Sequence, residues 1–226
     1  MVLPTLCQNR VEMHGYAPLL LHHTPTILSI REVVEDLGPA GWPLAKCEWA
    51  HAPSLARAIQ AGTAIGVADG SYMKERSTEH GATAWLLQPE PDSKKYCLGQ
   101  CSTSGTPREV NAYRSELQGV HALLLMIMVI CKAYNVTHGS VTLACDNDMA
   151  VEHTNDWRLD VPTSVHHTDL VRAIRRIRRD LPITMHMQYI DGHADKNRSF
   201  KELSPLEKLN CLADWDAKDH LRKVLG

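Results

Sequence analysis

The sequence predicts a mixed α/β fold, in which a five-stranded sheet carries helices on both of its faces. Five short apolar runs have the length and the bounding turn residues of strands, three before the first long helix pattern and two after it. That helix pattern, over residues 111–134, is apolar on every side of its middle section, so we expect it to be buried across the sheet. The order of elements favours three antiparallel strands followed by two parallel ones.

Each predicted element rests on a local signal. The expected strands cover residues 63–69, 80–88, 95–102, 140–146 and 184–190. The first strand is expected to end at a turn formed by Gly70-Ser71, and the second closes at Pro89-Glu90-Pro91. An amphipathic helix over residues 169–179 lies between the last two strands. The final helix begins with the capping box Ser204-Pro205-Leu206-Glu207 and runs to about Val224.

Residues 1–62 are expected to form an N-terminal extension of a domain that covers residues 63–226. Prolines and glycines interrupt the extension, and its one helix pattern, Pro53 to Ala61, ends near Gly62. The pair His22-His23 is interpreted as a polar loop pair rather than a metal site. Since the extension carries no chemical motif, we expect the function to reside in the later domain.

The 226 residues are 44% hydrophobic and 22% charged, which is ordinary for a soluble globular protein. The net charge of −2 gives no basic surplus of the kind that tight, non-specific binding to nucleic acid usually needs. A nuclease is not excluded, because metal-binding carboxylates lower the total charge. The seven cysteines form no C-x-x-C pair, which argues against a zinc ribbon and favours a reducing compartment.

The longest apolar run, residues 122–131, is about half as long as a membrane span. Residues 1–10 lack the basic and apolar regions of a secretory signal. We therefore expect an intracellular protein, cytoplasmic or nuclear, with no membrane partner, and we expect a monomer.

Four carboxylates stand where a sheet and its helices could bring them together. Asp69 and Asp146 each end a predicted strand, which places their side chains at the edge of the sheet. Glu116 lies early in the helix expected to be buried, where a carboxylate is costly to desolvate unless it binds a positive group. Asp214 lies in the last helix and shares a face with Asn210, four residues earlier.

If these four side chains converge, their mutual repulsion makes divalent cations the natural occupants of the site. Hard oxygen ligands suit Mg²⁺ or Mn²⁺. Two such ions about 4 Å apart can activate a water and stabilise the leaving oxygen of a phosphodiester. Any one of these aspartates could equally be a turn-former or a helix cap, but four carboxylates on four separate elements favour the metal site.

These residues belong to motifs that resemble those of the ribonuclease H family, in particular the domains attached to retroelement reverse transcriptases. The motifs are Asp69-Gly70-Ser71, Asn111-Ala112-Tyr113-Arg114-Ser115-Glu116-Leu117, Asp146-Asn147-Asp148, Gly192-His193 and Asn210-x-x-Ala213-Asp214-x-x-Ala217. The resemblance covers about residues 63–222, and the order of the motifs and the elements between them agree with the family.

The resemblance implies a ribonuclease H-like fold and endonucleolytic cleavage of the RNA strand of an RNA–DNA hybrid, which leaves 5′-phosphate and 3′-hydroxyl ends. Two Mg²⁺ ions, with Mn²⁺ as a substitute, would be held by Asp69, Glu116, Asp146 and Asp214. His193 would assist proton transfer or product release. The substrate-binding residues that the resemblance implies are Gly70, Ser71, Arg114, Asn147 and Asn210.

The same family context implies a partner and an origin. A reverse transcriptase domain in a parent polyprotein would be the partner. Residues 1–62 would then be a remnant of a connection segment.

Two departures from the family predict weak binding of the hybrid. Cellular members often carry asparagines just before the helix glutamate, where this chain has Ala112 and Tyr113. The region between Asp146 and Asp169 is too short and too poor in Lys and Arg for the basic protrusion of many cellular members. One candidate substitute, which could equally be a solvated face, is the arginine stripe Arg172, Arg175, Arg176 and Arg179.

Other functional classes are less favoured by the order of the acids. A non-catalytic nucleic-acid-binding domain of the same fold would not need all four. Proofreading exonucleases begin with an Asp-x-Glu pair, where this chain has Asp69-Gly70-Ser71. Transposases and integrases bring their glutamate last, whereas Glu116 lies between the first two aspartates.

Overall fold

A computed structural model describes residues 3–7, 10–14 and 28–226 of the chain. The strands β1 (Leu3–Cys7) and β2 (Arg10–His14) pair with each other in antiparallel fashion. The pair His22-His23, which was interpreted as a polar loop pair, lies outside the described residues.

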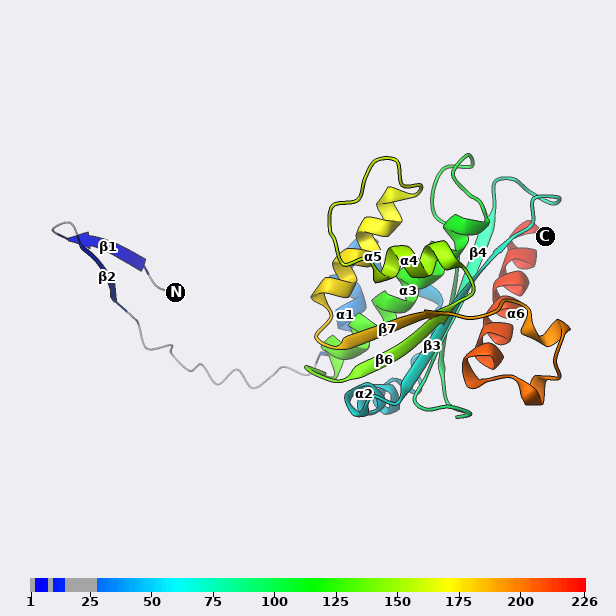
Figure 1. Cartoon of the computed structure of the whole chain (residues 1–226), viewed down its shortest axis with the longest axis horizontal. Coiled ribbons are helices and arrows are strands. Elements are labelled where there is room, and N and C mark those ends of the chain that lie inside the picture. The colour runs from blue at the N-terminus through cyan, green and yellow to red at the C-terminus, as the bar shows by residue number, and fades with distance from the viewer. Residues whose placement is uncertain (1–2, 8–9, 15–27) are drawn as a thin grey trace.

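A five-stranded mixed sheet with the strand order β5-β4-β3-β6-β7 forms the centre of the structure (Figure 1). Its strands are β3 (Ala64–Tyr72), β4 (Gly81–Gln88), β5 (Cys97–Ser102), β6 (Ser140–Cys145) and β7 (Thr184–Tyr189). β3, β4 and β5 form an antiparallel meander, while β6 is parallel to β3 and β7 is parallel to β6. The predicted fold class, a mixed sheet of three antiparallel strands followed by two parallel ones, is therefore confirmed.

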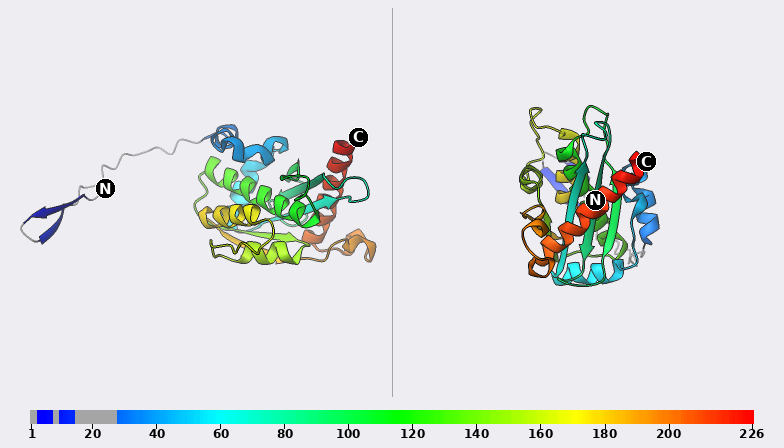
Figure 2. Two further views of the ribbon diagram at one scale, coloured as in Figure 1. Left: turned by 90° about the horizontal axis from the view of Figure 1, so that it is seen from above. Right: turned by 90° about the vertical axis from the view of Figure 1, so that its right-hand side faces the viewer.

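Helices cover both faces of this sheet (Figure 2). The helices are α1 (Ile30–Asp36), η1 (Gly38–Lys46), α2 (Ala52–Ala61), α3 (Ala112–Ala133), α4 (Asp148–Asn155), α5 (Thr168–Asp180), η2 (Ala194–Lys196), η3 (Phe200–Glu202) and α6 (Pro205–Leu225). α6 packs on one face against β3, β4 and β5. α3 crosses the other face, and both α1 and α5 pack on α3.

Side chains of β3 point alternately to the two faces of the sheet and contribute to a hydrophobic core on each. Ala64 and Ala68 belong to the larger core, which includes α3. Ile65 and Val67 belong to a smaller core with residues of α6 such as Ala213. Since successive side chains of a strand point to opposite faces, the apolar run of β3 can be buried on both sides.

The central helix α3 is buried, as its apolar sequence predicts. Among the described residues it is the one helix whose length and composition would allow it to cross a membrane, and most of its length is enclosed by the protein. Neighbours surround it, because the sheet lies on one side and α1, α2 and α5 lie on others.

Part of the predicted extension is built into this core. Val33 of α1, Leu44 of η1 and Ile59 of α2 are buried in the same cluster as α3. The predicted helix ending near Gly62 is confirmed, and Gly62 has the left-handed backbone (φ 74°) that closes α2. The division at residue 62 stays a prediction, although residues 28–62 share the core of the later residues.

Two local predictions were wrong. The turn at Gly70-Ser71 does not exist, because β3 continues to Tyr72 and these two residues pair with Thr83 and Ala82 of β4. Helix α4 was not predicted, since its sequence is polar and short. Its start is fixed instead by Asn147, whose side chain accepts a hydrogen bond from the backbone of Ala150 at 3.0 Å.

A close approach between β3 and α3 depends on Gly70. A Cβ atom at this position would lie 2.5 Å from the backbone nitrogen of Glu116 and 2.6 Å from the carbonyl carbon of Ser115. Both atoms belong to the helix backbone, so neither can move without shifting the helix. Glycine is therefore required at this point for the helix to lie against the strand.

We expect Gly70→Ala to lower the free energy of unfolding by about 1–3 kcal/mol, because the added methyl group overpacks a rigid contact. Urea unfolding followed by circular dichroism measures the change. The control is Gly38→Asn, where no atom lies within 4 Å of the added Cβ and asparagine tolerates the positive φ of 53°. The control should change the stability by less than about 0.5 kcal/mol. Equal effects of the two substitutions would contradict the packing argument.

Candidate active site

The four predicted carboxylates line one cavity of about 220 Å³. They come from four different elements, which are β3, α3, the end of β6 and α6. The residues that line the cavity are Asp69, Gly70, Ser71, Tyr72, Met73, Ala112, Glu116, Asp146, His193, Asp214 and Lys218. The structure therefore brings together all the acids and the histidine that the sequence singled out as catalytic, while their roles stay predictions.

The sheet register places Asp69 and Asp146 at the same edge. The parallel pairing of β3 with β6 runs only as far as Val67 and Ala144, and β6 ends at Cys145. Asp69 therefore lies where β3 continues beyond its parallel neighbour, and Asp146 directly follows the end of that neighbour. The prediction that Asp69 ends its strand was wrong, but the predicted meeting of the two side chains was correct because β6 stops short.

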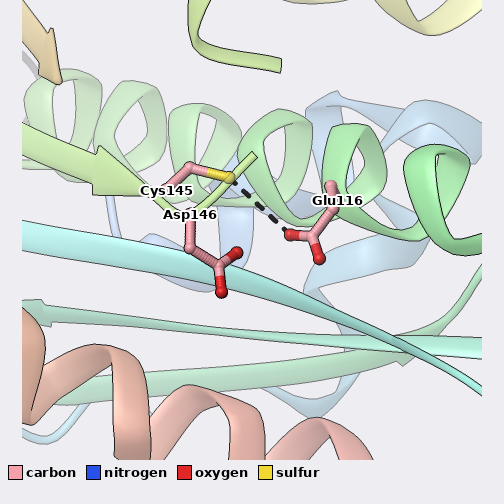
Figure 3. A group of neighbouring side chains, drawn as sticks. All are labelled: Glu116, Cys145 and Asp146. Carbon is pink, nitrogen blue, oxygen red and sulfur yellow. Dashed lines mark hydrogen bonds between the residues drawn. The ribbon is translucent and has the colours of Figure 1, made fainter. Parts of the chain in front are cut away.

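Glu116 is held by its neighbours rather than by water. It is 8% exposed, and its Oε2 accepts a hydrogen bond from the backbone nitrogen of Gly70 at 3.0 Å. The thiol of Cys145 donates a second, weaker bond to the same oxygen at 3.7 Å (Figure 3). The donor atoms of Glu116, Cys145 and Asp146 all lie within 4.8 Å of one another.

Asp214 faces a positive side chain from its own helix. The ammonium group of Lys218, one turn later in α6, lies 2.6 Å from Asp214 Oδ2. His193 Nδ1 lies 3.9 Å from the same oxygen. Lys218 was not among the predicted site residues, although its spacing of four residues from Asp214 would have been the signal.

Burial and mutual repulsion disfavour the charged forms of the acids. Burial raises the pKa of Asp69 well above its usual value, and the carboxylates of Asp146 and Asp214 raise it further. The pKa of Glu116 is raised by burial and then by Asp69 and Asp146. Burial also raises the pKa of Asp146, against a hydrogen bond from Asn210 that lowers it. A cluster in this state is stabilised by any cation that can reach it.

The residues present fit a divalent metal ion. Asp69 is 4% exposed, and oxygen atoms from four carboxylates face one cavity, which is the donor set that Mg²⁺ prefers. Asn210 adds a second indication. Its amide nitrogen lies 3.4 Å from Asp146 Oδ2, and its own Oδ1 is buried with no hydrogen-bond partner among the described residues.

The loop after β7 also touches the cluster. A Cβ atom on Gly192 would lie 2.4 Å from Asp146 Oδ2, so a side chain at this position would displace the Asp146 carboxylate. The next residue, His193, has a left-handed backbone with φ of 53°. These two backbone features direct the half-exposed ring of His193 into the cavity that the acids line.

The predicted substrate-binding residues occupy different places. Gly70 and Ser71 line the cavity of the acids, while Asn147 caps α4 and Asn210 contacts Asp146. Arg114 is buried, and it lines a separate and larger groove of about 1220 Å³ at the start of α3 and α5.

The guanidinium of Arg114 is already satisfied by protein groups. It forms a bidentate pair with Asp169, at 3.0 and 2.6 Å, and a contact with His167 Nδ1 at 3.2 Å. Ala112 lines both this groove and the cavity of the acids, so the two are neighbours.

The predicted arginine stripe needs a correction. Arg175 is 3% exposed, and it pairs with Asp156 at 2.8 Å and donates to the backbone oxygen atoms of His153 and Arg158. It therefore ties the connection after α4 to α5 instead of facing solvent. Arg176 is exposed and forms none of the ion pairs found among the described residues. Periodicity could not separate these two, because the loop that covers Arg175 was read as an open connection.

No known protein-family profile matches the sequence, and no curated protein matches it. Several solved structures are similar to the chain, among them the following three. LC11-RNase H1, isolated from compost and solved in complex with an RNA/DNA hybrid, covers 73% of this chain and 100% of its own, at 13% identity and a TM-score of 0.49. The N-terminal RNase H domain of a protein from Mycobacterium tuberculosis covers 73% and 99%, at 13% identity and a TM-score of 0.46.

The third structure is RNase H1 from the halophilic archaeon Halobacterium salinarum. It covers 65% of this chain and 98% of its own, at 14% identity and a TM-score of 0.40. Sequence identities this low carry no information about activity, so activity can be inferred only from the residues of the site.

We expect Asp69→Asn to stabilise the metal-free protein, because it removes a buried charge that its neighbours repel. In the presence of a chelator the midpoint of thermal unfolding should rise by roughly 2–6 °C, which corresponds to about 1–2 kcal/mol. With Mg²⁺ at about 100 times its Kd, the native protein should gain about 2.7 kcal/mol and the variant much less.

The control is the exposed Asp160→Asn, which should change neither the midpoint without metal nor the response to Mg²⁺. A drop in the midpoint of Asp69→Asn without metal would contradict the repulsion that we assign to the cluster.

Proposed function

We propose that the chain is a ribonuclease H-type endonuclease, which uses divalent metal ions to cleave the RNA strand of RNA–DNA hybrids and leaves 5′-phosphate and 3′-hydroxyl ends. One observation carries the proposal. Asp69, Glu116, Asp146 and Asp214 come from four elements of the predicted fold and line a single cavity. If each acid served only as a turn-former or a helix cap, the four side chains would not be expected to meet in one cavity.

The metal ions would be held by these four carboxylates, with Mg²⁺ as the ion and Mn²⁺ as a substitute. When bound, two such ions supply an activated water and stabilise the leaving oxygen. The protein's part is to hold the acids in place. Gly70 and Cys145 fix Oε2 of Glu116, and Asn210 fixes Oδ2 of Asp146, so each carboxylate keeps its direction.

His193 and Lys218 would act on protons and charge at the open side of the cavity. His193 Nδ1 lies 3.9 Å from Asp214 Oδ2 and lines the same cavity, so its imidazole would be placed to donate a proton to a leaving oxygen there. The ammonium group of Lys218 lies 2.6 Å from the same carboxylate oxygen. Lys218 thus reduces the negative charge that a phosphodiester would meet.

The chain would bind the hybrid only weakly unless another domain contributed to the affinity. Neither Ala112 nor Tyr113 offers the side-chain amide expected for strand discrimination, and Arg114 is bonded within the protein. Gly70 and Ser71 would contact the backbone of the substrate at the cavity. A reverse transcriptase domain in a parent polyprotein could supply the missing affinity, which would fit a retroelement origin, a connection-like role for residues 1–62 and a monomeric nuclease domain.

We expect the full chain to cut the RNA strand of a labelled RNA–DNA hybrid when Mg²⁺ or Mn²⁺ is added. Asp146→Asn should reduce the rate at least about a thousandfold, because several kcal/mol of transition-state stabilisation correspond to three or more factors of ten. The matched control is Asp148→Asn, an exposed carboxylate two residues later, which should leave the rate unchanged.

Gel analysis with single-stranded RNA and a DNA duplex tests the substrate class. If the chain binds the hybrid but never cuts it, the non-catalytic alternative is correct and the proposed activity is wrong. Equal cutting by Asp146→Asn would assign the activity to a contaminant.

We expect Arg176→Glu to weaken binding of the hybrid several-fold and to lower the slope of log K against log salt concentration by about 1, if its exposed guanidinium contacts a phosphate. Fluorescence anisotropy at several salt concentrations, in Ca²⁺ to prevent cleavage, measures both. Arg57→Glu on α2 is the control for a general change of charge. An unchanged slope for Arg176→Glu would remove α5 from the binding surface.

A further inference from the structure

Cys145 places a thiol inside the cluster of carboxylates. It is the last residue of β6, directly before Asp146, and its side chain is fully buried on the side of the sheet that faces α3. Its Sγ lies 3.7 Å from Glu116 Oε2 (Figure 3). In the part of the chain that the structure describes, Glu116, Cys145 and Asp146 form the one group of three histidine, cysteine or acidic side chains whose donor atoms lie close enough to share an ion.

The separation of these atoms matches a zinc site. A Zn²⁺ ion bound to a thiolate at about 2.3 Å and a carboxylate oxygen at about 2.0 Å, in tetrahedral geometry, holds the two donors about 3.5 Å apart. The observed distance between Sγ and Oε2 is 3.7 Å. The three donors would therefore need only small movements to close around one ion, which leaves a fourth position for water.

A second feature favours a cation beside Asp146. Asn210 is 3% exposed, and its Oδ1 has no hydrogen-bond partner among the described residues. The same amide group lies beside Asp146, with its nitrogen 3.4 Å from Oδ2. A buried carbonyl oxygen without a partner is costly, and a cation at Asp146 would offset that cost.

We propose that Glu116, Cys145 and Asp146 form a binding site for a thiophilic divalent ion, Zn²⁺ or its analogue Cd²⁺, which competes with the hard metal ions of the proposed nuclease. Binding breaks the S–H bond of Cys145, forms a metal–sulfur bond and releases the proton to solvent. The competition between Zn²⁺ and the hard metal ions rests on the proposed function, because the two kinds of ion would share Glu116 and Asp146. Occupation by Zn²⁺ would thus inhibit the enzyme in a way that a purely carboxylate site would not allow.

Ligand chemistry makes Cys145 the residue that discriminates between ions. Thiolates bind soft and borderline ions such as Zn²⁺ and Cd²⁺, whereas Mg²⁺ and Ca²⁺ take oxygen ligands. Other described cysteines, such as Cys97, Cys101 and Cys131, are buried as well, but none of them belongs to a group of donors close enough to hold an ion. Replacing the sulfur of Cys145 by oxygen should therefore change the choice of ion while the space stays filled.

Metal binding by the metal-free full chain tests the proposal without measuring cleavage. Zn²⁺ affinity is obtained by competition with a chromophoric chelator, and Cd²⁺ is added to look for the ultraviolet charge-transfer band of a cadmium–thiolate bond. The native protein should bind one Zn²⁺ and show the band. Cys145→Ser should lose the band and bind Zn²⁺ at least roughly 100-fold more weakly, because the loss of a direct ligand should cost no less than the 10- to 100-fold that follows removal of an outer partner.

Cys101→Ser is the matched control, since it replaces another buried cysteine and should keep both the affinity and the band. The protection of the native protein and of Cys145→Ser by Mg²⁺ in thermal unfolding should agree within about threefold in apparent Kd. Equal Zn²⁺ affinity of native protein and Cys145→Ser, or a native protein without the Cd²⁺ band, overturns the proposal. So does an equal loss of Mg²⁺ affinity, because Cys145 would then act only on the shape of the site.

If Cys145→Ser fails to fold, a native protein without the Cd²⁺ band still overturns the proposal, because that measurement needs no variant. Cleavage of the hybrid is a separate readout. Zn²⁺ should inhibit cleavage competitively with Mg²⁺ in the native protein and roughly 100-fold less strongly in Cys145→Ser, in line with the loss of Zn²⁺ affinity in that variant. If no cleavage is seen with any metal, the proposed function fails while the Zn²⁺ site stands or falls on the binding data.

Discussion

The contact between α3 and β3 at Gly70 is the constraint on which the site depends. Without a side chain at this position, the helix backbone comes close enough for the Gly70 N–H to donate to Glu116 at 3.0 Å. That bond fixes a buried carboxylate from a helix beside one from a strand. Because α3 is also the centre of the hydrophobic core, the packing of the whole domain holds this arrangement in place.

The buried acids of the site lower the stability of the folded protein without metal. Asp69 and Glu116 are buried among other acids, and burial and repulsion both raise their pKa values. At neutral pH the folded protein without metal must therefore either ionise these groups unfavourably or keep protons on them. Lys218 lowers the pKa of Asp69 and so offsets part of this cost, and the apolar core offsets the rest. Such strain is typical of a place where a ligand supplies the missing charge.

Charged side chains outside the cluster mostly serve the fold. Arg114 pairs with Asp169 and thereby joins the start of α3 to the start of α5. Arg175 pairs with Asp156 and holds the segment between α4 and α5. Both arginines looked like candidates for binding phosphate when only their sequence was known. Both are buried and each has a carboxylate partner within the protein, so neither guanidinium is free to bind phosphate.

The sequence alone determined the five strands, the buried helix and the four acids, since the period of apolar residues and the capping residues are local signals. It determined that Asp146 follows the end of a strand, and it placed Glu116 in an apolar helix. It did not reveal helix α4, whose polar sequence is helical only where Asn147 caps it and the neighbouring elements cover it.

Only the tertiary structure decided which residues meet. Asp69 lies inside β3, and it reaches the site because β6 is shorter than its neighbour, which is a property of the register and not of either sequence. Cys145 contacts Glu116 although 29 positions separate them along the chain. Distances between elements arise from packing, which involves residues far apart in sequence, so no local pattern could have shown that the thiol of Cys145 contacts Glu116.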